Sequence, residues 1–330
     1  MPLKVAIIYN DPYYDVPNEI GEAEAIIGVM EEVVAVKKAL LELGHEVQQV
    51  PLRKPLEDVK KTLASITADP IFNLFEGFDD DPGTEPIVTR WMEEMKIHFT
   101  GNPSHVLALT LDKEKTKELL NKAGINTPAY QVLMPHTVGA FKLNFPCIVK
   151  PKDEDASHGL TPDSVVRNME QLEKQVKHIS DNFRGYALVE EFIDGREFNA
   201  SVLGNDDLSL VEISEITYTL PPNLPRILTF ESKWFEGTEY YAGTGVACPA
   251  PIDSDLRKII TGIVLTACKA LGCRGYARVD MRQDDRGNIK VLEVNANPDI
   301  SPELGIARQA NARGWTYTQL IEKIVEHALE

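Results

Sequence analysis

Residues 275–298 read GYARVDMRQDDRGNIKVLEVNANP, two apolar-charged runs separated by a polar, glycine-bearing turn. The turn residues between two alternating runs predict a β-hairpin. Side chains alternate along a strand, so Arg278 and Asp280 share one face of the first run. We infer from the symmetry of the hairpin that a register pairing Asp280 with Glu293 also pairs Arg278 with Asn295. The same alternation predicts Val291 on the charged face of the second run.

Two carboxylates that face each other on one sheet repel, unless one is protonated or a cation lies between them. Asp280, Glu293 and the amide oxygen of Asn295 form a hard oxygen site, which suits Mg²⁺ or Mn²⁺ carrying the phosphates of a nucleotide. The alternative is a solvated strand face on which Arg278 neutralises the acids. The hairpin alone leaves both interpretations open.

Three other segments contain residue types that bind nucleotides. FPCIVKP places Lys150 at the end of a buried strand, and a polar loop with a glycine follows, a type of loop that binds phosphate through backbone N–H groups. Lys113 lies at the start of a helix in LDKEKTKELL, and LVEEFIDGREF continues from a strand through Gly195 to Glu197. Each segment alone is more typical of a surface lysine or of a plain strand and turn than of a nucleotide site.

The first third of the chain alternates strand and helix patterns. Strands are predicted at 5–9, 46–50 and 71–75, with a short run at 97–100, and helices at 22–43 and 84–95. This order predicts a parallel sheet covered by helices. No GxGxxG follows the first strand, so a dinucleotide site is not supported.

The remainder has a different pattern. It predicts helices at 111–123, 164–182 and 254–271, strands at 145–150, 186–192, 198–203 and 210–216, then the hairpin and two closing helices. An irregular stretch at 217–251 separates two of these elements. Because compact domains rarely contain a loop of that length without a function, we expect a lid or binding segment there.

The composition excludes several classes of protein. The 330 residues predict two or three domains. A net charge of −17 without a Lys/Arg-rich run disfavours nucleic-acid binding. No apolar stretch approaches the roughly 20 residues of a membrane span. The first residues lack signal-peptide features, and the four cysteines form no CxxC pair. We therefore expect a cytoplasmic protein with reduced cysteines.

In this order and spacing, the segments resemble the ATP-grasp superfamily, and specifically the D-alanine–D-alanine ligase family. The resemblance is strongest over residues 109–298. It implies a mixed α/β (α+β) fold with ATP gripped between two antiparallel sheets. The implied units are an N-terminal Rossmann-like domain (1–105), a central ATP-grasp subdomain (106–190) and a C-terminal subdomain with the metal site and lid (191–330).

The resemblance also implies roles for individual residues. Nucleotide binding is implied for Lys113, Lys150, Glu190, Glu191, Phe192, Ile193, Glu197, Lys233 of the lid motif FESKWFEG, and Leu292. The implied metal ligands are Asp280, Glu293 and Asn295, and the implied catalytic residues are Arg278, Lys150 and Ser157. Backbone N–H groups of residues 297–300 are implied to assist Arg278 at a tetrahedral oxyanion.

The activity implied is an ATP-dependent carboxylate–amine ligase that forms a peptide bond through an acyl phosphate and releases ADP and phosphate. Magnesium, with two ions expected and manganese as an alternative, is the implied metal. Amino acids or small peptides are the implied substrates, and a homodimer is expected. The alternatives are an authentic cell-wall D-alanine–D-alanine ligase, and a carboxylate kinase or ATP-binding regulatory module on this fold.

The motifs around the amino-acid substrates depart from the family pattern. Ala156 replaces the first of two adjacent serines in the glycine loop, and Trp234 replaces a tyrosine in the lid. PDISPELG replaces PGMTSHSL after the hairpin, and Glu22 or Glu24 is a weak match for a substrate-binding glutamate. The departures put D-alanine in doubt as the substrate at both positions, because a few polar contacts determine specificity.

Overall fold

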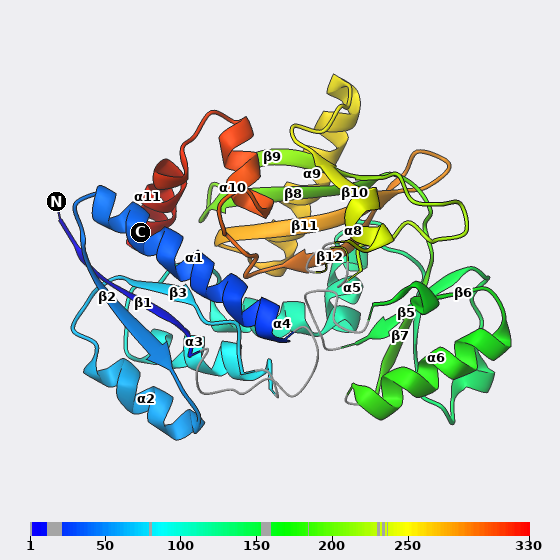
Figure 1. The fold of residues 1–330 in the computed structure, drawn as a ribbon, viewed down its shortest axis with the longest axis horizontal. Helices are drawn as coiled ribbons and strands as arrows, with labels where there is room; N and C mark the ends of the chain where they lie inside the picture. Colours follow the sequence, from blue (N-terminus) through cyan, green and yellow to red (C-terminus); the bar gives the residue numbers. More distant parts are fainter. Residues whose placement is uncertain are drawn as a thin grey trace.

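The computed structural model describes residues 2–11, 22–78, 81–152, 160–183, 185–229, 232, 235 and 237–330, with only the backbone for residues 22–27. It contains one parallel sheet and two antiparallel sheets, which follow one another along the chain (Figure 1). The mixed α/β class predicted from the sequence is therefore confirmed.

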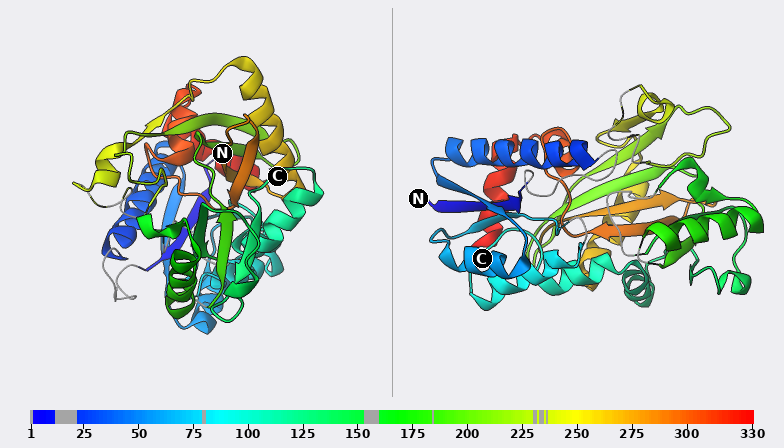
Figure 2. Two further views of the ribbon diagram at one scale, coloured as in Figure 1. Left: turned by 90° about the vertical axis from the view of Figure 1, so that its right-hand side faces the viewer. Right: turned by 60° about the horizontal axis from the view of Figure 1, so that its bottom comes forward.

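The first sheet has the strand order β2-β1-β3, and all its pairs are parallel. Its strands are β1 (Lys4–Asn10), β2 (Glu46–Leu52) and β3 (Ile71–Leu74), and its helices are α1 (Glu22–Glu42), α2 (Leu56–Ser65) and α3 (Thr84–Glu94). Val5 and Ile7 pack into one core cluster and Ala6 and Ile8 into another, so β1 is buried on both faces. Figure 2 shows α1 on one side of this sheet and α2 and α3 on the other.

The second sheet is antiparallel, in the order β4-β7-β5-β6. It consists of β4 (Tyr130–Leu133), β5 (Cys147–Pro151), β6 (Val165–Val166) and β7 (Ala187–Glu191), and the helices of this part are α4 (Ser104–Leu111), α5 (Lys113–Lys122) and α6 (Met169–Asn182). The prediction of a helix from residue 164 is wrong at its start. Asn168 caps α6 by accepting a hydrogen bond from the Gln171 N–H, and β6 precedes it. β4 was not predicted.

The third sheet is antiparallel, in the order β10-β9-β8-β11-β12. Its strands are β8 (Glu197–Gly204), β9 (Ser209–Tyr218), β10 (Thr244–Ala247), β11 (Gly275–Gln283) and β12 (Ile289–Asn295). The helices α8 (Glu239–Gly243), α9 (Ser254–Leu271), α10 (Gly305–Ala312) and α11 (Tyr317–Ala328) complete the chain. The stretch 217–251, predicted to be irregular, contains α8 and the edge strand β10, whose sequence TGVA carries too little alternation to predict a strand.

The hairpin register predicted from the sequence is confirmed. Asp280 pairs with Glu293, and Arg278 pairs with Asn295. A β-bulge follows, because Met281 pairs with Val291 and leaves Leu292 as an extra residue on β12. The prediction that Val291 shares the charged face is therefore wrong. Val291 is completely buried in the apolar core, on the same side as Val294.

One asparagine joins the first part of the chain to the hairpin. Asn102 is 2% exposed, and its Nδ2 donates to the carbonyl oxygens of Tyr276 and Ala296, each at 2.7 Å. Its Oδ1 accepts from the N–H of Arg274 at 2.8 Å. These bonds fix the hairpin, and thus its charged face, relative to the segment that leads into α4.

Candidate active site

Two buried charged residues and one that is largely buried meet between the second and third sheets. Glu190 at the end of β7 and Lys117 on α5 each have a side chain only 1% exposed, and they form an ion pair. The Nζ atom of Lys150, on β5, lies 2.8 Å from Glu190 Oε2. Lys117 also donates to the carbonyl oxygen of Leu292 at 3.1 Å. The bulge left Leu292 outside the ladder, so its carbonyl is available to this lysine and ties the cluster to β12.

The charges in this cluster are strongly coupled. Burial by itself raises the pKa of Glu190, but Lys117 and Lys150 outweigh it and lower this pKa to about 2. Burial also lowers the pKa of Lys117, an effect that Glu190 partly offsets. With both lysines protonated, Glu190, Lys117 and Lys150 together carry a net charge of +1, and little solvent reaches them. Such an excess of positive charge favours an anion such as a phosphate.

The charged face of the hairpin lies within electrostatic reach of this cluster. Lys117 donates to the carbonyl oxygen of Leu292, the residue before Glu293, and Glu293 pairs with Asp280, which accepts from Arg278. The charge of Glu293 opposes the burial that lowers the pKa of Lys117, and it adds to the effect of Asp280 on the pKa of Arg278. Arg278 donates from Nε and Nη2 to the two oxygens of Asp280, each at 2.8 Å, and Asn199 donates to Asp280 Oδ1 at the same distance. Although burial opposes it, the neighbouring carboxylates led by Asp280 raise the pKa of Arg278, so its guanidinium stays charged.

The predicted hinge, residues 190–193, joins the second sheet to the third. The N–H groups of Glu191 and Phe192 donate to the carbonyl oxygens of Ala129 and Pro146, which fixes the path of the hinge backbone. The Glu191 side chain lies outside the cluster and forms a 2.7 Å ion pair with Lys290. At the far end, Glu197 is 6% exposed and accepts from Arg282 and from the Tyr218 hydroxyl.

Gly195 lies between the hinge and β8, and its lack of a side chain allows this segment to approach β11 closely. A Cβ atom on Gly195 would lie 1.7 Å from the carbonyl oxygen of Gln283, so no side chain fits there without moving the backbone. The neighbouring Gln283 N–H donates to the Arg196 carbonyl at 2.9 Å.

We therefore expect Gly195→Ala to displace the hinge from β11 and to weaken ATP binding by at least about tenfold, as misplacement of a positioning element does. Titration of the purified variant with ATP measures the effect. Gly139→Ala is the control, because a Cβ there meets no atom within 4 Å. Equal ATP affinity in the two variants would contradict this role of Gly195.

The oxygen donors on the hairpin are of the type that a magnesium ion takes. Both oxygens of Asp280 accept from Arg278, and a carboxylate oxygen that accepts one hydrogen bond has a second lone pair that can bind a metal. Asp280 and Glu293 face each other, and Asn295 lies two residues further along β12. The Oδ1 of Asn295 accepts one hydrogen bond, from the Asn297 N–H at 2.9 Å. Within the described part of the chain, no three His, Cys, Asp or Glu side chains converge on a metal position. The hairpin offers two carboxylates and an amide, and phosphate oxygens would fill the remaining positions around a magnesium ion.

The backbone after the hairpin differs from the predicted oxyanion hole. The Ile300 N–H donates to Glu32 Oε1 at 2.8 Å, and the Asn297 N–H is used by Asn295. Burial and the charges of Asp299 and Glu76 raise the pKa of Glu32 well above its ordinary value. Two of the N–H groups at 297–300 thus already have side-chain acceptors, which leaves Arg278 as the principal candidate donor.

Several predicted site residues lie apart from this centre or outside the described residues. Lys113 is 4% exposed at the first position of α5, whereas Lys117, one turn later, is the lysine that reaches Glu190. Ser157 and Lys233 fall outside the described residues, as do Ala156 and Trp234. For Glu22 and Glu24 the structure describes only the α1 backbone.

Sequence reasoning missed Lys117, Arg282 and Tyr218. A signal existed for Arg282, which shares the charged face of β11 with Arg278 and Asp280 by simple alternation. Lys117 lies four residues after Lys113 on the same helix face, but nothing in the sequence distinguishes it from a surface lysine.

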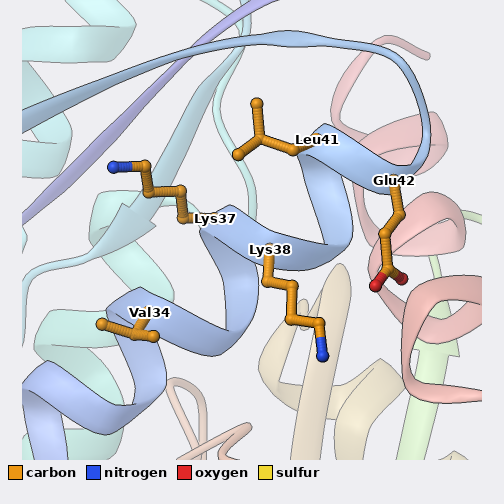
Figure 3. Close-up of a pocket in the computed structure, with 5 residues that line it drawn as sticks. All are labelled: Val34, Lys37, Lys38, Leu41 and Glu42. Carbon is orange, nitrogen blue, oxygen red and sulfur yellow. The ribbon is translucent and has the colours of Figure 1, made fainter.

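A shallow hollow of about 440 Å³ lies elsewhere, on the outer face of α1. Its lining residues come from one helix, as Figure 3 shows: Val34, Lys37, Lys38, Leu41 and Glu42. Lys37 donates to Gln49 on β2 at 2.7 Å, so this hollow belongs to the first sheet and not to the charged centre. No helix in the described ranges is long and apolar enough to cross a membrane.

The three sheets and the position of the charged centre define an ATP-grasp protein. The structure matches the VanG D-Ala:D-Ser ligase of Enterococcus faecalis with a TM-score of 0.75 at 21% identity, covering 99% of this chain and 100% of that one. It matches a D-alanine–D-alanine ligase of Bacillus anthracis complexed with ATP equally well, with a TM-score of 0.75 at 21% identity over 100% and 97% of the two chains. At this identity the matches establish the fold.

The family follows from the sequence comparisons. The family model for the D-ala D-ala ligase C-terminus matches residues 119–326. The D-alanine–D-alanine ligase of Aquifex aeolicus is 30% identical over 88% of this chain and 92% of its own length, and an uncharacterised protein of Sinorhizobium fredii is 30% identical over 99% and 97%. The chain belongs to the D-alanine–D-alanine ligase family, and it is an ATP-dependent ligase.

Proposed function

We propose that this ligase joins the carboxylate of one amino acid or small peptide to the amine of another. The γ-phosphoryl group of ATP moves to a carboxylate oxygen, and the amine displaces phosphate from the acyl phosphate. The observation that carries this proposal is the buried Lys117–Glu190–Lys150 cluster beside the hairpin face with Arg278. The cluster supplies excess positive charge that can bind a triphosphate. Arg278 supplies a cation that can stabilise a developing oxyanion.

The chain's own residues divide the work of binding ATP. Lys150 and Lys117 hold the phosphates, with Lys113, and with Ser157 and Lys233 on the family pattern. The hinge backbone at Glu190, Glu191, Phe192 and Ile193 binds adenine, Leu292 lies against the nucleotide, and Glu197 binds the ribose. Asp280, Glu293 and Asn295 hold magnesium, as two ions or with manganese in its place. Bound magnesium offsets the negative charge of the β- and γ-phosphates.

Arg278 performs the remaining chemical role. Its guanidinium is aligned by two hydrogen bonds to Asp280, and its charge persists at neutral pH. A fixed cation at this position orients the carboxylate for in-line transfer and then stabilises the oxyanion formed when the amine attacks. The lid, residues 217–251, excludes water from the acyl phosphate, which water would otherwise hydrolyse.

The identity of the two substrates is where this chain differs from the family pattern. The segment PDISPELG places Asp299 and Glu303 where the family has uncharged residues. A Cβ atom on Gly305 would lie 3.4 Å from the Asp299 carbonyl oxygen and 4.0 Å from Arg278 Nη1, so Asp299 lies near the proposed oxyanion site. A free carboxylate on the acceptor is disfavoured beside this charge. We therefore favour an acceptor other than D-alanine, with D-alanine–D-alanine ligation as the second candidate.

We further propose boundaries near residues 105 and 190 for the three structural units, a homodimer and a cytoplasmic location. The first proposed boundary lies between the last strand of the first sheet, β3, and the first strand of the second, β4, and the other lies at the end of β7, before the third sheet begins at β8.

Incubation with ATP, magnesium and pooled D- and L-amino acids tests the proposed function. Released phosphate and the mass of the condensed product are measured together. The expected result is phosphate release that depends on an amine and yields a product lighter than its two parts by one water. Activity with D-alanine alone would select the second candidate. ATP turnover without any amine requirement would contradict ligation and indicate a carboxylate kinase.

A further inference from the structure

The carboxylate of Glu197 has its two oxygens in unlike surroundings. Oε2 accepts from the Tyr218 hydroxyl at 2.7 Å, from Arg282 Nε at 3.1 Å and also from Arg282 Nη2. No described residue donates to Oε1, and this oxygen is not one of the fully enclosed polar atoms that lack a partner. One oxygen is therefore held by the protein, and the other remains open to a ligand.

Arg282 is itself firmly held. It is 4% exposed, its Nη1 donates to the Ile193 carbonyl at 2.7 Å, and its Nη2 also donates to the Arg226 carbonyl. Its guanidinium lies 5.5 Å from the Phe192 ring centre and 5.9 Å from that of Tyr218. A buried guanidinium is tolerated only when its donors are satisfied, and here the acceptors come from the hinge, from Glu197 and from the segment after β9.

Two other arginine–glutamate pairs, each with its glutamate on β9, show a different geometry. Arg257 reaches both oxygens of Glu212, at 2.5 and 3.0 Å, and Arg196 reaches both oxygens of Glu215, each at 2.7 Å. Such two-oxygen pairing leaves neither oxygen without a donor. The pair of Arg282 with Glu197 differs, because every hydrogen bond that the Glu197 side chain accepts from the described residues goes to Oε2.

We propose that Arg282, assisted by Tyr218, is a positioning residue that fixes Glu197 so that Oε1 receives the ribose hydroxyls of ATP. The inference rests on the proposed role of Glu197 in ribose binding. A glutamate without these bonds would lose side-chain rotamer entropy when ATP binds, and this loss would weaken binding. The Glu197 carboxylate is already fixed in the folded protein, so ATP binding does not carry this cost. Burial and the charge of Glu197 raise the pKa of Tyr218 well above its ordinary value, so its hydroxyl remains a donor.

The test compares ATP with 2′,3′-dideoxy-ATP, which lacks both ribose hydroxyls. Dissociation constants are measured by titration, with magnesium, for the full chain and for Arg282→Met, Arg282→Lys and Arg257→Met. We expect the unmodified chain to prefer ATP by roughly ten- to hundredfold, the usual effect of hydrogen bonds to a charged group. Arg282→Met should bring this ratio close to one, Arg282→Lys should restore part of it, and Arg257→Met should leave it unchanged.

Steady-state kinetics give an independent readout. Arg282→Met should raise the KM for ATP by about tenfold and change kcat at saturating ATP much less, because ribose contacts persist unchanged through phosphoryl transfer. If Arg282→Met weakens both nucleotides equally and keeps the ratio, Arg282 has a structural role only and the proposal is overturned.

Tyr218→Phe removes one donor to the same oxygen and keeps the test decisive if Arg282→Met does not fold. It should lower the nucleotide ratio part of the way, and an unchanged ratio would overturn the proposal. An unmodified chain that binds both nucleotides equally would reject the ribose role of Glu197 while leaving the ligase function standing. An unmodified chain without affinity for ATP would reject the proposed function as well.

Discussion

Arg278→Ala is expected to lower the turnover of ligation by about 10²–10³-fold, the usual cost of removing an oxyanion donor. Arg278 has a side chain 20% exposed and is aligned by Asp280, so its cation is pre-organised before substrate arrives. The change also leaves Asp280 without its guanidinium partner. Amine-dependent phosphate release at saturating ATP measures the effect.

Arg257→Ala is the matched control for Arg278→Ala, because Arg257 also pairs with a carboxylate but lies on α9, away from the charged centre. Its turnover should stay close to that of the unmodified chain. If Arg278→Ala retains turnover within about threefold of this control, well short of the loss of an oxyanion donor, the catalytic role of Arg278 is wrong.

Glu190→Gln is expected to lower the free energy of unfolding by about 3–5 kcal/mol, because breaking a buried ion pair leaves uncompensated charge. Here two lysines, Lys117 and Lys150, lose their shared counter-charge. Denaturant unfolding at pH 7 measures the change. The control is Glu191→Gln, whose side chain is 44% exposed and whose ion pair with Lys290 should contribute less than about 1 kcal/mol.

The effect of Glu190→Gln should also depend on pH. The lysines lower the pKa of Glu190 from 4.5 to about 2 on folding, so its ionised form stabilises the folded chain. That contribution is complete above about pH 4.5 and disappears as the pH falls towards 2. The difference in stability between the unmodified chain and Glu190→Gln should shrink over this window. A difference that stays constant down to pH 2 would contradict the ion-pair account.

Strand alternation was enough to predict much of the hairpin. The mixed α/β class followed from the strand and helix patterns of the first third together with the resemblance to the ATP-grasp superfamily. The register of Asp280 with Glu293 followed from the symmetry of the ladder, and the structure confirms it. The bulge at Leu292 was not predictable, because it is required by the packing of Val291 and Val294 into one core. Because of this single extra residue, Val291 points to the apolar face of the sheet and not to the charged face. The carbonyl of Leu292 is then available to accept from Lys117.

The cluster around Glu190 was beyond sequence reasoning for another reason. Lys117, Lys150 and Glu190 come from α5, β5 and β7. The antiparallel pairing of β5 with β7 brings Lys150 to Glu190, and the packing of α5 adds Lys117. The sequence marked Glu190 as part of a hinge whose backbone binds adenine. Its side chain has a different task, because it holds the two lysines at the base of the predicted phosphate site.

The Arg282–Glu197–Tyr218 group depends on the same kind of tertiary information. The three residues lie on the neighbouring strands β11, β8 and β9, and the register between these strands places their side chains together. A sequence with no alignment shows that Arg282 is charged, but not that it is 4% exposed with a carboxylate as its partner.

In the proposed reaction, ATP activates a carboxylate by transferring its γ-phosphoryl group to one of the carboxylate oxygens. An amino-acid substrate identified in the pooled assay is labelled with ¹⁸O in its carboxylate and ligated with unlabelled ATP, and the released phosphate is analysed by mass. Because the bond broken by the amine lies between carbon and the labelled oxygen, one ¹⁸O per product should appear in phosphate. Product formation with unlabelled phosphate, or with label in AMP, would contradict the acyl-phosphate route.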